Sequence, residues 1–380
     1  MNKTRAAVAF IMFFSIYGGG NFYIAIRLYQ WLNLLFANIN AMIYAGIFIF
    51  LVLSMFLAFW PLPLNVKKIL TWVSAYWIGM FVYLLVFIFL ADIVILLGWI
   101  TGIIPDPIPQ SVLFYRGATA VSLTAGVIGY GIYNANRIKL VSYEIQLKQA
   151  ALNNLRIVLI SDLHLGDVNS ENNLERMVKK INDLNPDIVC IAGDIFNDNF
   201  YNIRDPDRAV ALFGSIEARY GVFACLGNHD GGGTLSQMKN FLKESKIKLL
   251  NDEYVIIDER FALFGRLDSS PIRGFGELRR QNISDDIAAV GANMPVIVME
   301  HSPAHIREYN SEVDLILAGH THGGQIFPGG LITRAMFTVD YGHYQKDENS
   351  PHVIVTSGAS TWRPPMRIGT NNEIVSIILR

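Results

Sequence analysis

The stretch Leu315-Ile316-Leu317-Ala318-Gly319-His320-Thr321-His322 decides which fold we expect for the second half of this chain. Its first four residues are apolar and predict a buried β-strand, and the glycine that follows allows the backbone to turn sharply. Two histidines then stand two residues apart at the end of that strand. Neutral imidazole is the commonest side-chain ligand of metal ions, so the stretch predicts a metal site at a strand end.

The same succession of an apolar run and a polar motif occurs four more times after residue 155. Those runs lead into Asp162-Leu163-His164, Gly193-Asp194, Gly227-Asn228-His229-Asp230 and His301. Segments with helical spacing, such as 174–184, separate the runs, and this alternation predicts an α/β sheet with covered faces. Ligands of such sheets bind beyond the carboxyl ends of the strands, and every motif falls at such an end.

Seven side chains suited to metal binding are therefore expected to converge: Asp162, His164, Asp194, Asn228, His301, His320 and His322. Nitrogen and oxygen ligands without thiolates suit Mn, Fe, Zn or Co, and the sequence leaves the choice among them open. Two such ions about 3.5–4 Å apart can clamp the attacking and leaving oxygens of a hydrolysis. The alternative, unrelated polar residues at strand ends, is disfavoured by the ordered set.

Over residues 155–380 these five motifs resemble, in content and order, those of the calcineurin-like metallophosphoesterase superfamily. The resemblance implies a four-layer α/β/β/α sandwich and two divalent metal ions. It implies one ion on Asp162, His164 and His322, the other on Asn228, His301 and His320, and Asp194 as the bridge. The implied nucleophile is a metal-bridged hydroxide that attacks phosphorus.

The resemblance also implies a catalytic role for His229, which would stabilise the developing charge or protonate the leaving oxygen. Asp230 is expected to orient His229. The second motif departs from the family pattern Gly-Asp-x-x-Asp, because Asn197 occupies the last position and Asp198 follows it. This departure puts the supporting carboxylate in doubt. The closing segment 357–369 resembles that of small membrane-associated bacterial and archaeal members.

The N-terminal region differs from the rest in composition. Residues 1–150 carry nine Lys or Arg and three Asp or Glu, against 31 and 32 in the whole chain. Four apolar stretches, at roughly 6–26, 41–60, 69–100 and 117–133, predict an all-α transmembrane bundle over residues 1–135. Arg116, near one end of a stretch, is the only charge expected within a span, so no transport pathway is expected.

The distribution of basic residues predicts the orientation of these spans, since Lys and Arg mark cytoplasmic loops. Basic residues precede the first stretch, separate the second from the third (Lys67, Lys68) and follow the fourth (Arg137, Lys139). Four spans place the catalytic domain, residues 155–380, in the cytoplasm of a multi-pass protein at the cell membrane. The first stretch is the weakest, and the orientation changes without it. Residues 136–154 are expected to be a linker, with an edge strand or a surface helix left open for 143–154.

The expected function is metal-dependent hydrolysis of a phosphomonoester or a phosphodiester. Two alternatives remain: a lipid-linked nucleotide pyrophosphatase resembling UDP-diacylglucosamine hydrolases, and a membrane sensor whose esterase domain only binds ligand. The expected partners are a phosphoester substrate, lipid-linked in the first alternative, and the bilayer. Nucleic acid is not expected, because no basic stripe with interleaved aromatic residues occurs. Arg363 and His343 are left open between a structural role and a contact with substrate.

Overall fold

Residue contacts divide the chain into two units, Met1–Ile132 and Tyr133–Arg380. The computed structural model describes residues 3–36, 38–58, 60, 62–147, 152, 154–166 and 168–380. Each unit has its own buried apolar core, so each is described by itself.

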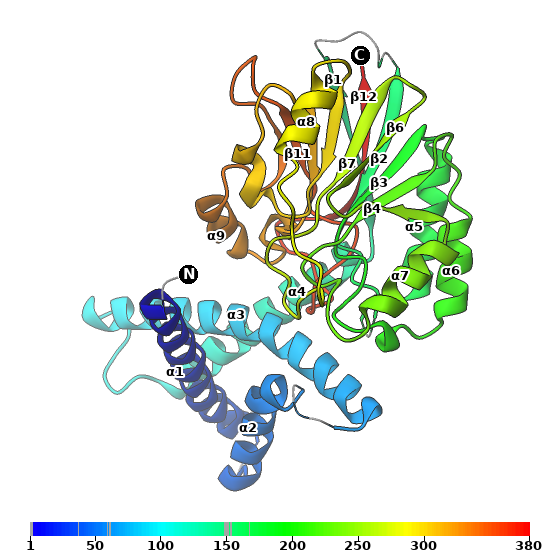
Figure 1. The fold of residues 1–380 in the computed structure, drawn as a ribbon. Coiled ribbons are helices and arrows are strands. Elements are labelled where there is room, and N and C mark those ends of the chain that lie inside the picture. Colours follow the sequence, from blue (N-terminus) through cyan, green and yellow to red (C-terminus); the bar gives the residue numbers. More distant parts are fainter. Residues whose placement is uncertain are drawn as a thin grey trace. The chain divides into compact units, whose positions relative to one another are not determined.

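The first unit is helical. Its helices are α1 (Lys3–Leu35), α2 (Ala41–Leu57), α3 (Leu64–Ile100) and α4 (Gln110–Ala135), whose last residues enter the second unit (Figure 1). The four apolar stretches of the sequence overlap these helices in turn. Among the described residues, α3 and α4 are long and apolar enough to cross a membrane, and α2 is apolar but has only 17 residues. Large apolar side chains such as Phe89 and Leu97 are exposed on α3, as on helices that face lipid.

The expectation that Arg116 is the only charge within a span is wrong, because α3 also contains Asp92. Oδ2 of Asp92 accepts from the Tyr23 hydroxyl at 2.6 Å and lies 2.7 Å from Nε of Arg27. Oδ1 of Asp92 lies 3.3 Å from Nη1 of Arg116, whose side chain is 3% exposed. Both arginines also donate to Oε1 of Gln30, each at 3.2 Å. We call these five residues the helical cluster; in it every charged group has an oppositely charged partner.

The second unit contains two six-stranded sheets. The first has the order β1-β12-β2-β3-β4-β5, with bounds β1 Ile138–Ile145, β12 Asn372–Leu379, β2 Leu155–Ile160, β3 Ile188–Ala192, β4 Val222–Cys225 and β5 Ile247–Leu249. The second has the order β10-β11-β9-β8-β7-β6, with bounds β10 Gly342–Tyr344, β11 His352–Val355, β9 Leu315–Ala318, β8 Val296–Met299, β7 Phe261–Gly265 and β6 Glu253–Ile257. Their central strands are almost entirely apolar, because both faces of each sheet are covered.

Alternate residues of these strands point to opposite faces, which produces four layers. Side chains such as Leu159 and Leu317 meet between the two sheets. The outer face of the first sheet packs against α5 (Glu171–Asp183), α6 (Pro206–Gly214) and α7 (Leu235–Glu244). That of the second packs against α8 (Ser284–Gly291) and a 3-10 turn at Pro303–Glu308 (Figure 1). The expected α/β/β/α sandwich is confirmed.

The segment 136–154, which we expected to be a linker, contributes strand β1. β1 runs parallel to β12 at the edge of the first sheet, with Ile138 opposite Asn372 and Ile145 opposite Leu379. Of the two conformations left open for 143–154, the edge strand is therefore the one adopted as far as residue 145. Residues 148–151 and 153 lie outside the described part of the chain.

Candidate metal centre

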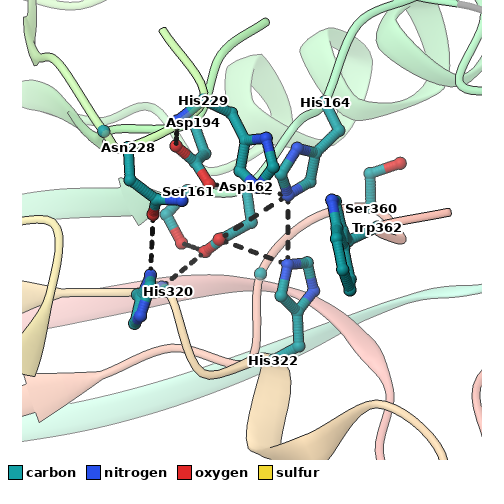
Figure 2. Close-up of polar contacts among 12 residues, drawn as sticks. Ser161, Asp162, His164, Asp194, Asn228, His229, His320, His322, Ser360 and Trp362 are labelled. Carbon is teal, nitrogen blue, oxygen red and sulfur yellow. Dashed lines mark hydrogen bonds and ion pairs between the residues drawn. The ribbon is translucent and has the colours of Figure 1, made fainter. Parts of the chain in front are cut away.

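The loops that follow five strands meet at one edge of the sandwich. Strands β2, β3 and β4 run parallel within the first sheet, as do β8 and β9 within the second, so their carboxyl ends share an edge. All seven side chains expected to bind metal lie in these loops and form a connected cluster: Asp162, His164, Asp194, Asn228, His301, His320 and His322. Figure 2 labels all of them except His301. All of them are buried except His320, which is partly buried.

One group in this cluster consists of Asp162, His164 and His322. The Nε2 atoms of the two histidines lie 3.1 Å apart, and Oδ1 of Asp162 lies 3.3 Å from Nε2 of His322. Two nitrogens that bind one ion at about 2.0–2.1 Å lie roughly 2.9–3.4 Å apart, so this spacing fits a shared cation. Oδ1 of Asp162 is also buried without any hydrogen-bond donor. A buried carboxylate oxygen without a donor destabilises the fold unless a cation binds it, so this oxygen fits a metal ligand.

The other group consists of Asn228, His301 and His320. Oδ1 of Asn228 lies 3.0 Å from Nε2 of His301 and 2.9 Å from Nδ1 of His320. Nδ1 of His301 is 2.8 Å from the Ala192 carbonyl oxygen, which can only accept, so the ring proton belongs on Nδ1. In its neutral form the His301 ring would then direct the lone pair of Nε2 into the cluster, as a metal-binding histidine does.

Asp194 stands between the two groups. Its Oδ2 atom lies 3.7 Å from Nε2 of His164 and 3.3 Å from Nε2 of His301. Its Oδ1 atom accepts the backbone N–H of His229 at 2.8 Å, which fixes the carboxylate. One oxygen of a single carboxylate thus faces both groups.

The backbone at the site adopts conformations that side chains other than glycine rarely take. Asp162, His164, Asp194, His320 and His322 all have φ between 44° and 74°. Such strain persists only where the surrounding structure enforces it, and it gathers at functional sites. Gly319 is required by close approach, because a Cβ atom there would lie 2.1 Å from Oγ of Ser161.

His229 lies next to the cluster, but its expected partner is not the one that the structure shows. Nδ1 of His229 lies 2.7 Å from Oδ1 of Asp198. The two oxygens of Asp230 instead accept the backbone N–H groups of Phe196 and Gly227, both at 2.8 Å. The expectation that Asp230 orients His229 is therefore wrong, and Asp230 orders the loop. Asp198, one residue beyond the usual family position, is the carboxylate that holds the ring.

Burial and neighbouring charges give the histidines different protonation states. Burial lowers the pKa of His164 to about 3 and that of His320 to about 4, so both rings are neutral and can donate lone pairs. Burial also lowers the pKa of His229, but the hydrogen bond that its ring donates to Asp198 and the charge of Asp194 outweigh it. The pKa of His229 is raised overall, which favours a ring that keeps its proton.

Sequence analysis missed Arg367, which is fully buried beside His322. Its Nη1 donates to the His322 carbonyl at 2.8 Å, its Nη2 to the Ser357 carbonyl at 2.7 Å, and its Nε to Oδ1 of Asn372 at 2.7 Å. This guanidinium therefore ties the closing segment of the chain to the histidine turn. His343, by contrast, is exposed on β10 and lies 3.0 Å from His352, outside the cluster.

Comparison with known proteins identifies the family. A family model described as calcineurin-like phosphoesterase matches residues 155–324. An uncharacterized metallophosphoesterase of Aquifex aeolicus is 32% identical over 228 residues, 60% of this chain and 85% of that protein. A Danio rerio protein, named transmembrane protein with metallophosphoesterase domain, is 29% identical over 284 residues, 70% of this chain. An uncharacterized metallophosphoesterase of Campylobacter jejuni is 30% identical over 232 residues, 60% of this chain. The alignments span 63% and 59% of the Danio rerio and Campylobacter jejuni proteins. The chain belongs to the calcineurin-like metallophosphoesterase family.

Proposed function

We propose that residues 155–380 hydrolyse a phosphomonoester or a phosphodiester with the help of two divalent metal ions. The position of Asp194 carries the proposal, because one of its oxygens faces both groups at 3.7 and 3.3 Å. The group of Asp162, His164 and His322 would hold one ion, and the group of Asn228, His301 and His320 the other, both drawn from Mn, Fe, Zn or Co. When bound, the ions would supply a water molecule of lowered pKa and positive charge for the phosphoryl oxygens.

His229 is proposed as the proton donor to the leaving oxygen. Its ring lies 5.1 Å from that of His164, so it borders the space where the phosphorus would be held. His229 lies close enough to His164 and Asp194 to bind an ion with them. Its bond to Asp198 and its raised pKa favour proton transfer instead, because a ligand must give up its proton.

The purified full chain in detergent, loaded with Mn, provides the test. We expect elemental analysis to find two ions per chain, and turnover of bis(p-nitrophenyl) phosphate, p-nitrophenyl phosphate or both. His343→Ala is a matched control, since it removes a histidine outside the cluster and should change neither result. Absence of turnover together with absence of bound metal would overturn the proposal.

We propose further that the chain is a multi-pass membrane protein with its second unit in the cytoplasm. Two long apolar helices and the basic residues around the apolar stretches support this orientation. Both native cysteines, Cys190 and Cys225, are buried, so a cysteine introduced at Asp106 or Asp347 can be labelled selectively. In intact cells a membrane-impermeant maleimide should label Asp106→Cys but not Asp347→Cys. The reverse labelling would contradict the orientation.

A membrane location favours a substrate that itself resides in the bilayer, so a lipid-linked phosphoester is the second candidate. Membrane lipid extracts and water-soluble phosphoesters, offered to the same Mn-loaded protein, separate the two candidates. Release of a phosphorylated product from lipid at a higher kcat/KM than from the soluble esters supports the lipid-linked substrate. A preference for soluble esters overturns it.

A further inference from the structure

We propose that Arg273, Trp362 and Arg363 form an outer subsite that binds a second phosphoryl group of the substrate, next to the one held at the metal centre. The inference rests on the proposed function and specifies its substrate class as compounds with two linked or neighbouring phosphoryl groups. The position of each residue, the charge around them and the chemistry of the guanidinium group carry the argument.

Arg273 is fixed beside the loop that carries Asn228 and His229. The residue before it, Ile272, donates its backbone N–H to the Asn228 carbonyl at 2.9 Å, and the carbonyl of the residue after it, Gly274, accepts from the backbone N–H of Gly232 at 2.7 Å. The backbone of Arg273 is therefore pinned on both sides to the metal-centre loop. Its side chain is exposed, so it can meet a ligand.

Arg363 is fixed from the other side by Gln325, which follows the histidine turn. The Gln325 amide donates to the carbonyls of Trp362 and Pro364 at 2.8 and 3.1 Å and accepts the Trp362 backbone N–H at 2.8 Å. Arg363 itself has φ of 55°, a conformation that this clamp enforces. Its guanidinium lies 5.4 Å from the centre of the Trp362 ring, which in turn lies 5.7 Å from that of His229 (Figure 2).

Among the described residues, two guanidinium groups and one carboxylate act on one another here. Burial raises the pKa of the Asp198 carboxyl, but the hydrogen bond and charge of His229, and the charges of Arg273 and Arg363, lower it below its usual value. Both guanidinium groups therefore act on one carboxylate that is already bonded to His229. Burial lowers the pKa of Arg363; the charge of Asp198 opposes this effect, and the charge of Arg273 adds to it. An anion at this place would relieve the repulsion.

The chemistry of the guanidinium group favours a phosphoryl group as that anion. A single guanidinium fork matches one planar carboxylate, whereas two forks from separate segments suit the several oxygens of a tetrahedral phosphoryl group. Asp198 binds Nδ1 of His229, so the arginines surround the residue that we propose as donor to the leaving oxygen. They are thus placed to bind the leaving group of the substrate, with Trp362 available to its apolar part.

Two esters that differ by one phosphoryl group provide the test: diphenyl phosphate and P1,P2-diphenyl diphosphate. Water adds to diphenyl phosphate with cleavage of a P–O bond to give phenol and phenyl phosphate, and to the diphosphate with cleavage of P–O–P to give two phenyl phosphates. We expect Arg273→Gln and Arg363→Asn each to lower kcat/KM for the diphosphate about ten- to hundredfold, and for diphenyl phosphate by a smaller factor. Asparagine is chosen at 363 because it tolerates positive φ.

Arg279→Gln is the matched control, since it removes the same charge from the same loop. Among the described residues, the Arg279 side chain bonds only to the neighbouring carbonyls of Gly276 and Leu278. Arg279→Gln should leave kcat/KM unchanged for both esters. Equal losses on both esters, or no loss on the diphosphate, would overturn the outer subsite.

A binding measurement separates this inference from the proposed function. If the wild-type chain hydrolyses neither ester, calorimetry with P1,P2-diphenyl imidodiphosphate still decides the question. Weaker binding to Arg273→Gln and Arg363→Asn than to Arg279→Gln supports the subsite without catalysis. Equal binding to all three variants, or no binding to the wild type, overturns it.

Discussion

The two units each contain a cluster of charged side chains, and the clusters differ in how those charges are satisfied. In the helical cluster, Asp92 of α3 is held by Tyr23 and Arg27 of α1 and by Arg116 of α4, so donors from two other helices surround one carboxylate. In the metal centre, acceptors face one another instead. Oδ1 of Asp162 is buried with no hydrogen-bond partner among the described residues, and the Nε2 atoms of His164 and His322 lie 3.1 Å apart.

The balance of hydrogen-bond donors and acceptors, rather than residue type, therefore separates a structural cluster from a binding site. Charges within a membrane region are expected to be functional by default, yet the helical cluster completes itself with its own arginines. The metal centre lacks donors for its carboxylate and imidazole lone pairs, and cations would supply what is missing.

The largest effect on activity is expected from Asp194→Asn. The change keeps the size of the side chain but removes the charge that faces both groups, so we expect kcat/KM to fall by about a thousandfold or more. Elemental analysis should find fewer than two ions per chain. Asp92→Asn makes the same chemical change in the helical cluster and should leave the metal content intact. A fully active Asp194→Asn protein would contradict the bridging role.

A second test divides the metal centre itself. His320→Ala and His322→Ala each remove one imidazole from the same turn, but from different groups. We expect each variant to lower the affinity for one ion by about 10–100-fold or more and to leave the affinity for the other ion close to the wild-type value. Calorimetric titration with Mn measures both affinities. If either variant lowered the affinity for both ions equally, the division into two groups would be wrong.

Asp92→Asn should destabilise the helical unit, because it leaves the buried Arg116 guanidinium without its counter-charge. Loss of one partner of a buried ion pair costs about 3–5 kcal/mol, and the value here should be at the lower end because Arg27 is 32% exposed. Unfolding by sodium dodecyl sulfate in mixed micelles, followed by circular dichroism, measures the loss. The double variant Asp92→Leu with Arg116→Met should recover most of it. Unchanged unfolding of Asp92→Asn would show that the cluster contributes no stability.

The smallest effect is expected from Asp198→Asn, which weakens the support of His229 but leaves both groups of metal ligands intact. We expect kcat to fall about tenfold with a methyl leaving group, and less with p-nitrophenyl, because a good leaving group needs little protonation. Rates with methyl p-nitrophenyl phosphate and dimethyl phosphate measure the contrast. Asp258→Asn, at an exposed carboxylate bonded to Tyr220, is the control. Equal losses on both esters would argue against proton donation by His229.

Much of the metal centre was predictable because each of its motifs consists of a few consecutive residues. Each ligand follows an apolar run, and parallel strands bring the ends of those runs to one edge. The supporting residues have no local signal. Arg367 contacts His322, which is distant in the sequence, by donating to its backbone carbonyl. Asp92 lies in the apolar helix α3, and its partners come from α1 and α4. The sequence left the supporting carboxylate in doubt, because Asp198 lies one residue beyond the usual family position. The structure shows that the loop nevertheless brings Asp198 to His229.

The pairing of β1 with β12 has a consequence for synthesis on the ribosome. β1 and β2 are translated before the other strands of the first sheet, yet the strand that lies between them, β12, is made from residues 372–379. Until those residues emerge, the nascent chain holds two strands whose hydrogen-bonding groups on that side await a partner, and such open edges invite aggregation. Completion of the first sheet therefore waits until residues 372–379 have left the ribosome, after all its other strands have been made.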